Sequence, residues 1–178
     1  MLELTSNKIK VLGIFGRLTP DSEAYFDKIE DEFSKKPASD DYDIFRHLTL
    51  TFIPNASVSD LKQQLDLLKS LKNFLPLKID VSSATVKDEE SLDGAQHIAF
   101  EFDLSQTKEI VDFIEQKVGG KSVATWYIKV VWFVPKENQK AVIEILADLE
   151  TLEFSDFYLV SNKQDEANTI YTTTSFQS

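Results

Sequence analysis

The sequence predicts an α+β fold built from two small antiparallel sheets with helices outside them. Apolar, β-branched runs alternate along the chain with segments whose apolar residues recur every three or four positions, as is typical of strands and amphipathic helices. The 178 residues suit one domain, or two lobes that share a core. The elements follow the order β-α-β-α, β-β-α-β-α, β-β, which indicates a loose duplication. We therefore expect residues 1–178 to form a single bilobal domain.

The first half of the chain begins with an apolar, β-branched run over residues 8–17, which predicts a strand. Thr19 can cap the helix that follows, with Pro20 at the first helical position, where a missing N–H group is tolerated. One apolar stripe of this helix recurs every four residues and consists of Tyr25, Ile29 and Phe33.

A second strand is expected over residues 44–53, after a polar loop over residues 37–43. Pro54 is expected to end this strand. Ser57 and Asp60 have the spacing of a capping box, in which each side chain bonds the other residue's backbone N–H group. The buried face of the helix that they begin is expected to consist of Leu61, Leu65, Leu68 and Leu71.

The second half repeats this alternation of strands and helices. Strands are expected over residues 77–86, 96–104, 123–134, 154–160 and 169–176. One helix is capped by Ser105 and ended by Gly119 and Gly120, and another covers residues 136–149. The polar segments 87–94 and 161–168 are expected to be connections between strands.

The composition excludes several classes of function. There are 19 Lys and Arg residues against 30 Asp and Glu residues, so a net charge of −11 disfavours binding to duplex nucleic acid. The chain has no cysteine and only two histidines, which excludes thiolate metal sites and a three-histidine zinc site. No apolar run approaches the roughly 20 residues of a membrane span, and residues 1–8 do not resemble a secretory signal. We expect a cytoplasmic protein without a metal or cofactor, and the sequence identifies no protein partner.

One strand carries a motif that suits phosphate chemistry, namely His47-Leu48-Thr49. Alternate residues of a strand share a face, so His47, Thr49 and Thr51 are expected to point one way. An imidazole beside a hydroxyl suits a phosphate ester, because the imidazole moves a proton while the hydroxyl donates to a phosphate oxygen. The same spacing also fits a half-buried strand with a polar outer face. The core face of the strand is expected to consist of Leu48, Leu50 and Phe52.

This motif, together with the order of strands and helices around it, resembles the 2H phosphoesterase superfamily. That superfamily includes 2′-5′ RNA ligase-like proteins and cyclic nucleotide phosphodiesterases. The resemblance covers nearly the whole chain in element order and is specific in letters only from His47 to Phe52. It implies two lobes around a central groove, each supplying a His-x-Thr or His-x-Ser motif. One histidine would then act as base and the other as acid, the two hydroxyls would hold the phosphate, and no metal would take part.

The second motif is expected in the strand before the helix over residues 136–149, and there the pattern is degenerate. Lys129 aligns with the second histidine and Val131 with its hydroxyl partner, and neither keeps the chemistry. Three interpretations of Lys129 remain open: a strand lysine that reaches water, a group that holds an anion opposite His47, or a catalyst with a shifted pKa. Tyr127, two residues earlier, either stacks on a base or packs.

Two further residues bear on the predicted site. Arg17 ends the first strand and either faces an anion in the groove or lies at a surface end. His97 does not begin a second motif, because Ala99 stands where the hydroxyl is required. We expect His97 on the surface or on a sheet face, and the alternative is that it reaches the groove.

The sequence thus predicts a 2H phosphoesterase-like protein that binds or weakly hydrolyses a small phosphate ester, such as a 2′,3′-cyclic nucleotide or an RNA end. Its catalytic residues would be His47 and Thr49, with Lys129, Tyr127 and Arg17 binding the substrate. The alternative is a non-catalytic protein-interaction module on the same fold. A third possibility is an unrelated α+β domain that carries this strand by coincidence.

Overall fold

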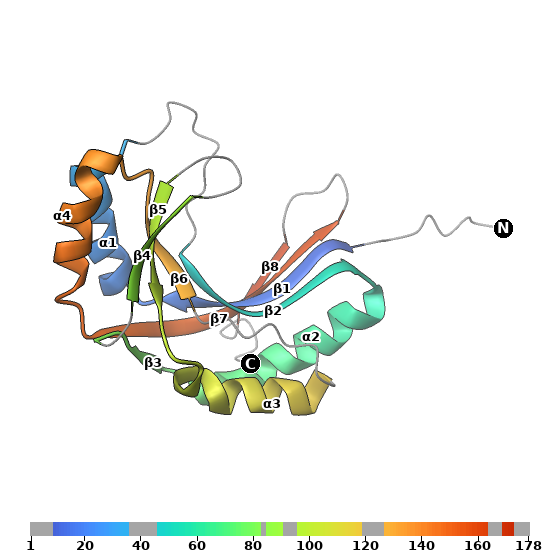
Figure 1. Ribbon diagram of the computed structural model, residues 1–178. Helices are drawn as coiled ribbons and strands as arrows, with labels where there is room; N and C mark the ends of the chain where they lie inside the picture. The colour runs from blue at the N-terminus through green and yellow to red at the C-terminus, as the bar shows by residue number, and fades with distance from the viewer. Residues whose placement is uncertain are drawn as a thin grey trace.

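Figure 1 shows the computed structural model, which describes residues 9–35, 46–82, 85–90, 96–118, 127–163 and 169–172. The elements in chain order are β1 (Ile9–Leu18), α1 (Pro20–Phe33), β2 (His47–Ala56), α2 (Val58–Leu71), η1 (Lys72–Phe74), β3 (Leu77–Asp80), β4 (Thr85–Glu90), β5 (Gln96–Glu101), η2 (Leu104–Thr107), α3 (Lys108–Val118), β6 (Tyr127–Trp132), α4 (Lys136–Leu146), β7 (Thr151–Lys163) and β8 (Thr169–Thr172). In this part of the chain, no helix is both long enough and apolar enough to span a membrane.

The described strands form two antiparallel sheets, as the sequence predicts. Sheet A is curled and has the order β2-β1-β7-β3, with β8 paired to β7. Sheet B has the order β4-β5-β6. The predicted α+β class with two antiparallel sheets and outer helices is therefore confirmed.

Two helices, α1 and α3, are exchanged between the two halves of the chain, because each packs away from the sheet of the strand that precedes it. Helix α2 packs on β1 and β7 of sheet A, and α3 packs against α2, although α3 follows a strand of sheet B. Helix α1 follows a strand of sheet A but packs on β6 and against α4, which lies on β4 and β5. In Figure 1, α2 and α3 lie below sheet A, whereas α1 and α4 lie to the left of sheet B.

Two of the helix starts follow from local sequence. Thr19 caps α1 by accepting a hydrogen bond from the N–H group of Ser22, at 3.3 Å, with Pro20 at the first position. Ser57 and Asp60 form the predicted capping box at the start of α2. Both predictions are confirmed because a cap needs only groups within one turn of the helix.

Arg46, directly before β2, joins the two sheets. Its Nε donates a 2.6 Å hydrogen bond to the carbonyl oxygen of Val130 in β6. Its guanidinium pairs with Glu23 at 2.7 Å and with Asp27 and Glu30 at 2.8 Å, all three on α1. Burial alone would lower the pKa of Arg46, but the hydrogen bond to Glu23 and the charge of Glu30 leave it raised. The guanidinium therefore stays charged and binds the start of β2 to the edge of sheet B.

The same edge of β6 is closed by the end of α1. The N–H group of Trp132 donates to Glu30 Oε1 at 3.0 Å, and Ser34 Oγ donates to the carbonyl oxygen of Trp132 at 2.5 Å. The N–H group of Lys35 donates to the carbonyl oxygen of Phe133. An edge strand otherwise presents unpaired backbone groups, so these contacts replace a fourth strand in sheet B.

Several predicted boundaries are wrong. Pro54 does not end β2, because β2 is an edge strand and Pro54 pairs with Val11 without having to donate to a further strand. The strand predicted over residues 77–86 is two strands, β3 and β4, which lie in different sheets. Strand β4 continues to Glu90, so residues 87–90 of the predicted turn over residues 87–94 are extended.

The start of the third helix was also predicted wrongly. Asp103, rather than Ser105, is the cap, and it caps the 3-10 turn η2 that precedes α3. Its carboxylate accepts the N–H group of Ser105 at 2.7 Å. Strand β7 runs through Lys163, so the first residues of the predicted connection over residues 161–168 belong to a strand. The predicted loop over residues 37–43 and the helix end at Gly119 and Gly120 lie outside the described residues.

Candidate functional site on sheet A

Two rows of side chains cross the helix-free face of sheet A. Residues that are directly opposite in antiparallel strands point to the same face of the sheet. The first row is His47, Arg17 and Asp156, from β2, β1 and β7 in that order. The second row, two residues away on each strand, is Thr49, Phe15 and Tyr158. The pairing therefore brings three predicted site residues together, namely His47, Thr49 and Arg17.

Aromatic contacts hold these rows in place. The rings of Phe15 and His47 meet edge to face with centres 4.8 Å apart, and Phe15 stacks on Tyr158 at 5.5 Å. The guanidinium of Arg17 lies 5.2 Å from the centre of the Tyr158 ring. Burial raises the pKa of Tyr158 well above its usual range, although the charge of Arg17 acts in the opposite direction. The Tyr158 ring is therefore a neutral support beneath a cation.

A β-bulge follows the His47-Leu48-Thr49 motif. Phe15 pairs with Thr49 and Ile14 with Thr51, so Leu50 has no opposite residue in β1. The extra residue turns the next side chains over, and Thr51 points into the core. Thr51 Oγ1 donates to Gln64 Oε1 on α2 at 2.7 Å and accepts the N–H group of Ile14 at 3.0 Å.

The bulge overturns part of the predicted pattern. Thr51 is 1% exposed and does not share the face of His47 and Thr49. Phe52 was expected in the core, but it is 42% exposed and stands opposite Gly13 on the helix-free face. Only the first two members of the predicted polar face, His47 and Thr49, are half-exposed on that face.

Strand β6 of sheet B carries a second bulge. Ala99 pairs with Lys129 and Ile98 with Val131, so Val130 is the unmatched residue. Lys129 therefore stands on the face of Ala99, whereas Val131 is fully buried in the core. Lys129 and Val131 therefore do not share a face, as alternate residues of a regular strand would.

The cation of Lys129 lies against an aromatic ring. Its Nζ is 5.1 Å from the centre of the Trp132 ring, and that ring is 5.2 Å from the ring of His97. His97 is 1% exposed, so it is not a surface histidine, although it does lie in a strand of sheet B. Tyr127 pairs with Glu101 in the backbone register, and its side chain lies outside the described residues.

The two strands are close at one place. Arg46 precedes His47, and its Nε bonds the carbonyl oxygen of Val130, which follows Lys129. The start of the motif on β2 is thus one arginine side chain away from the bulge on β6. Pairing between distant strands supplies Phe15, Tyr158 and Asp156, which no local pattern in the sequence marks as site residues.

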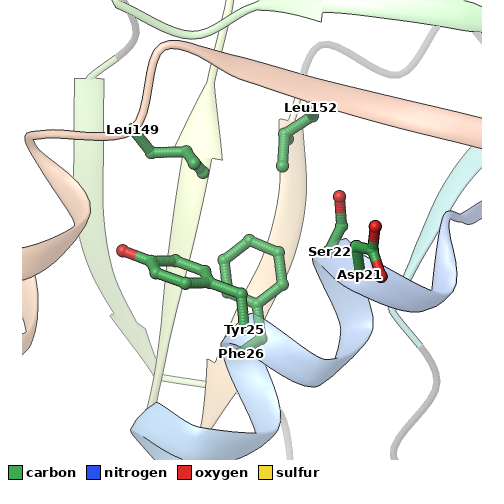
Figure 2. A pocket seen from close by; sticks show the side chains of 6 residues that line it. All are labelled: Asp21, Ser22, Tyr25, Phe26, Leu149 and Leu152. Atoms are coloured by element: carbon green, nitrogen blue, oxygen red, sulfur yellow. The ribbon is translucent and has the colours of Figure 1, made fainter.

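An open pocket of about 250 Å³ lies elsewhere, between α1 and the start of β7 (Figure 2). The rings of Tyr25 and Phe26 rise from α1 toward Leu149 and Leu152, with Asp21 and Ser22 at one side. None of these six lining residues is basic, so this cavity offers no charge for a phosphate. Within the described ranges, no three His, Asp or Glu side chains gather as a metal site requires.

The sequence matches no protein-family model and no curated protein. Among solved structures, the fold is similar to Kluyveromyces marxianus Usb1 with uridine monophosphate, with a TM-score of 0.50 and 11% sequence identity. The similarity covers 92% of this chain and 98% of that chain. The chain therefore has a fold distantly like that of Usb1.

Proposed function

We propose that this protein binds a small phosphate ester, a nucleotide or an RNA end, on the helix-free face of sheet A, and that it hydrolyses such esters weakly. The observation that carries the proposal is the pairing of His47 with Arg17 beside Thr49 on one face. A proton carrier, a fixed cation and a hydroxyl donor are the groups that a phosphate monoester or diester requires.

Each residue has a distinct role in this proposal. Arg17 attracts the phosphate and can donate two hydrogen bonds to it. Thr49 donates its hydroxyl to a phosphate oxygen, and His47 moves a proton to or from the reacting oxygen. Asp156 stands opposite Arg17, so a bound phosphate competes with this carboxylate for the guanidinium. We expect binding to be weaker than at a site with two cations.

Hydrolysis is expected to be slow because the second half lacks a matching acid or base. Lys129 is the group of β6 that offers a positive charge, and we propose that it holds the far side of the same anion. A second general acid or base contributes about 10²–10⁴-fold to a rate, which sets the scale of the deficit. Tyr127, in the same strand, remains our proposed contact for a base.

The comparison with Usb1 supports a nucleotide as the ligand class, since that protein was solved with uridine monophosphate. The contacts of Arg46 with Val130 and with α1 support the proposal that the chain is one bilobal domain, because they tie sheet A to sheet B.

Phosphorus NMR of 2′,3′-cyclic nucleotides incubated with the pure protein tests this function. We expect a slow monoester signal or His47-dependent broadening of the phosphate line. Both should be lost in His47→Ala and reduced in Thr49→Val. Thr151→Val, which removes an exposed strand hydroxyl at the far end of β7, is the matched control and should behave as wild type. Unchanged spectra in His47→Ala would remove the phosphate function.

The alternative is a non-catalytic protein-interaction module on the same fold. The absence of a histidine from β6 and the net charge of −11 favour it, since the first leaves His47 without a matching acid or base in that strand and the second opposes long polyanions. It predicts that neither turnover nor phosphate binding depends on His47, so the NMR measurement separates the two functions.

A further inference from the structure

An exposed aromatic ring extends the candidate site along β2. Phe52, Val58 and Leu104 are the large hydrophobic residues that stand exposed in the described part of the chain. Val58 begins α2 and Leu104 begins η2, so neither lies on a strand. Phe52 stands on the helix-free face of sheet A, in the row after Thr49 and Phe15. The bulge at Leu50 brings it to that face.

The neighbour of Phe52 across the sheet has no side chain. Gly13 pairs with Phe52, and a Cβ atom on Gly13 would lie 2.7 Å from Phe15 Cζ and 2.8 Å from the carbonyl oxygen of Thr51. The Phe15 ring therefore lies over Gly13, and a larger residue is excluded there. The rings of His47 and Phe15 therefore form a shallow aromatic surface that extends toward the exposed ring of Phe52.

We propose that Phe52 stacks on the nucleobase of a nucleotide whose phosphate is held by His47, Thr49 and Arg17. This inference rests on the proposed function and specifies its substrate as a nucleotide rather than a sugar phosphate. A rise of about 3.3 Å per residue, shortened by the bulge, puts Phe52 roughly 7–10 Å along β2 from Thr49. That separation suits a phosphate at one end and a base at the other. Every base has a stackable face, so the subsite accepts all four bases.

Calorimetric titration with two probes tests the subsite. Uridine 5′-monophosphate carries a base, and ribose 5-phosphate carries the same phosphate and sugar without one. We expect Phe52→Ala to weaken uridine monophosphate binding by about 5- to 100-fold, the range that loss of one stacked base implies. Ribose 5-phosphate affinity should change less than twofold. Phe52→Tyr keeps the ring and should restore binding of the nucleotide.

Leu104→Ala is the matched control, because it removes a similarly exposed hydrophobic side chain from another part of the surface. It should leave both affinities unchanged. Equal affinities of Phe52→Ala and wild type for the nucleotide would overturn the stacking subsite alone, provided that His47→Ala still abolishes binding of both probes. If wild type binds neither of the two probes, both the phosphate function and the subsite are overturned. The same conclusion follows if His47→Ala binds the probes as wild type does.

Discussion

Strands β2 and β6 hold equivalent places in the two halves of the chain, yet they differ in what they present. Each is the strand before the last helix of its half, and each contains one unmatched residue, Leu50 in β2 and Val130 in β6. Before its bulge β2 carries a histidine and a threonine. Before its bulge β6 carries Tyr127 and Lys129.

The bulges allow β2 and β6 to be aligned by structure, which the amino-acid sequence alone does not allow. Thr49 and Lys129 both directly precede the unmatched residue, and Thr51 and Val131 both follow it and point into the core. By this register the position of His47 corresponds to Tyr127, and not to Lys129. The comparison teaches that strand register places the side chains of β2 and β6 differently from an alignment by residue type.

The largest expected effect comes from rebuilding the second motif at the register that the bulge indicates. We expect Tyr127→His combined with Lys129→Thr to raise the hydrolysis rate of 2′,3′-cyclic nucleotides by about 10²-fold, because it supplies a second acid or base. Initial rates from phosphorus NMR measure this. The matched control is Lys129→His combined with Val131→Thr, whose new hydroxyl is buried in the core.

We expect that control pair to give no such gain in rate and to lower the free energy of unfolding by about 1–3 kcal/mol, because its hydroxyl is buried away from water. A rate gain in the control pair, without one in the first pair, would mean that the bulges are not equivalent.

Replacing Arg46, which connects the two sheets, should have the next largest effect. Arg46→Met removes the cation that pairs with Glu30, which is 2% exposed, and leaves that carboxylate buried. We expect a loss of about 3–5 kcal/mol in the free energy of unfolding, measured by urea denaturation. Lys108→Met breaks the pair with Asp112, and it should change the free energy of unfolding little because both side chains are exposed to water. Similar losses in the two variants would show that Arg46 is not a structural joint.

The two threonines on either side of the Leu50 bulge should separate stability from binding. Thr51→Val removes the buried hydroxyl that bonds Gln64, and we expect it to cost about 1–3 kcal/mol of stability. Thr49→Val should cost less stability but weaken phosphate binding. Denaturation and calorimetric titration of both variants measure the contrast. The interpretation of the bulge fails if the roles of the two threonines are reversed.

The smallest expected effect is on the pH dependence of stability, and it comes from Tyr158, whose ring lies against Arg17. Burial raises the pKa of Tyr158, so the folded state keeps its phenol neutral where an unfolded tyrosine ionises near pH 10. Its contribution to stability is therefore fully present below about pH 10 and is lost as the pH rises further. We expect the urea midpoint of wild type to fall more than that of Tyr158→Phe between about pH 8 and about pH 11. Equal decreases in the two urea midpoints would show that ionisation of the Tyr158 phenol does not affect stability.

The parts of the fold that local sequence determines were predictable. The caps at Thr19 and Ser57 need only neighbouring backbone groups, and the face of His47 and Thr49 needs only strand alternation. The positions of Thr51 and Phe52 were not predictable, because a bulge is a mismatch between two strands far apart in the sequence. The assignments of Val131 and His97 fail for a similar reason, since both depend on pairing within sheet B and on what covers it.

The exchange of helices between the halves has a consequence for how such a protein can change over time. Helix α1 of the first half closes the edge of β6 in the second, through Glu30 and Ser34. Each half therefore contributes to the packing of the other. A change in the side chains that β6 exposes leaves these backbone bonds in place, whereas loss of the strand would remove the partner of α1. The strand can thus be retained for its backbone alone, whatever its side chains bind.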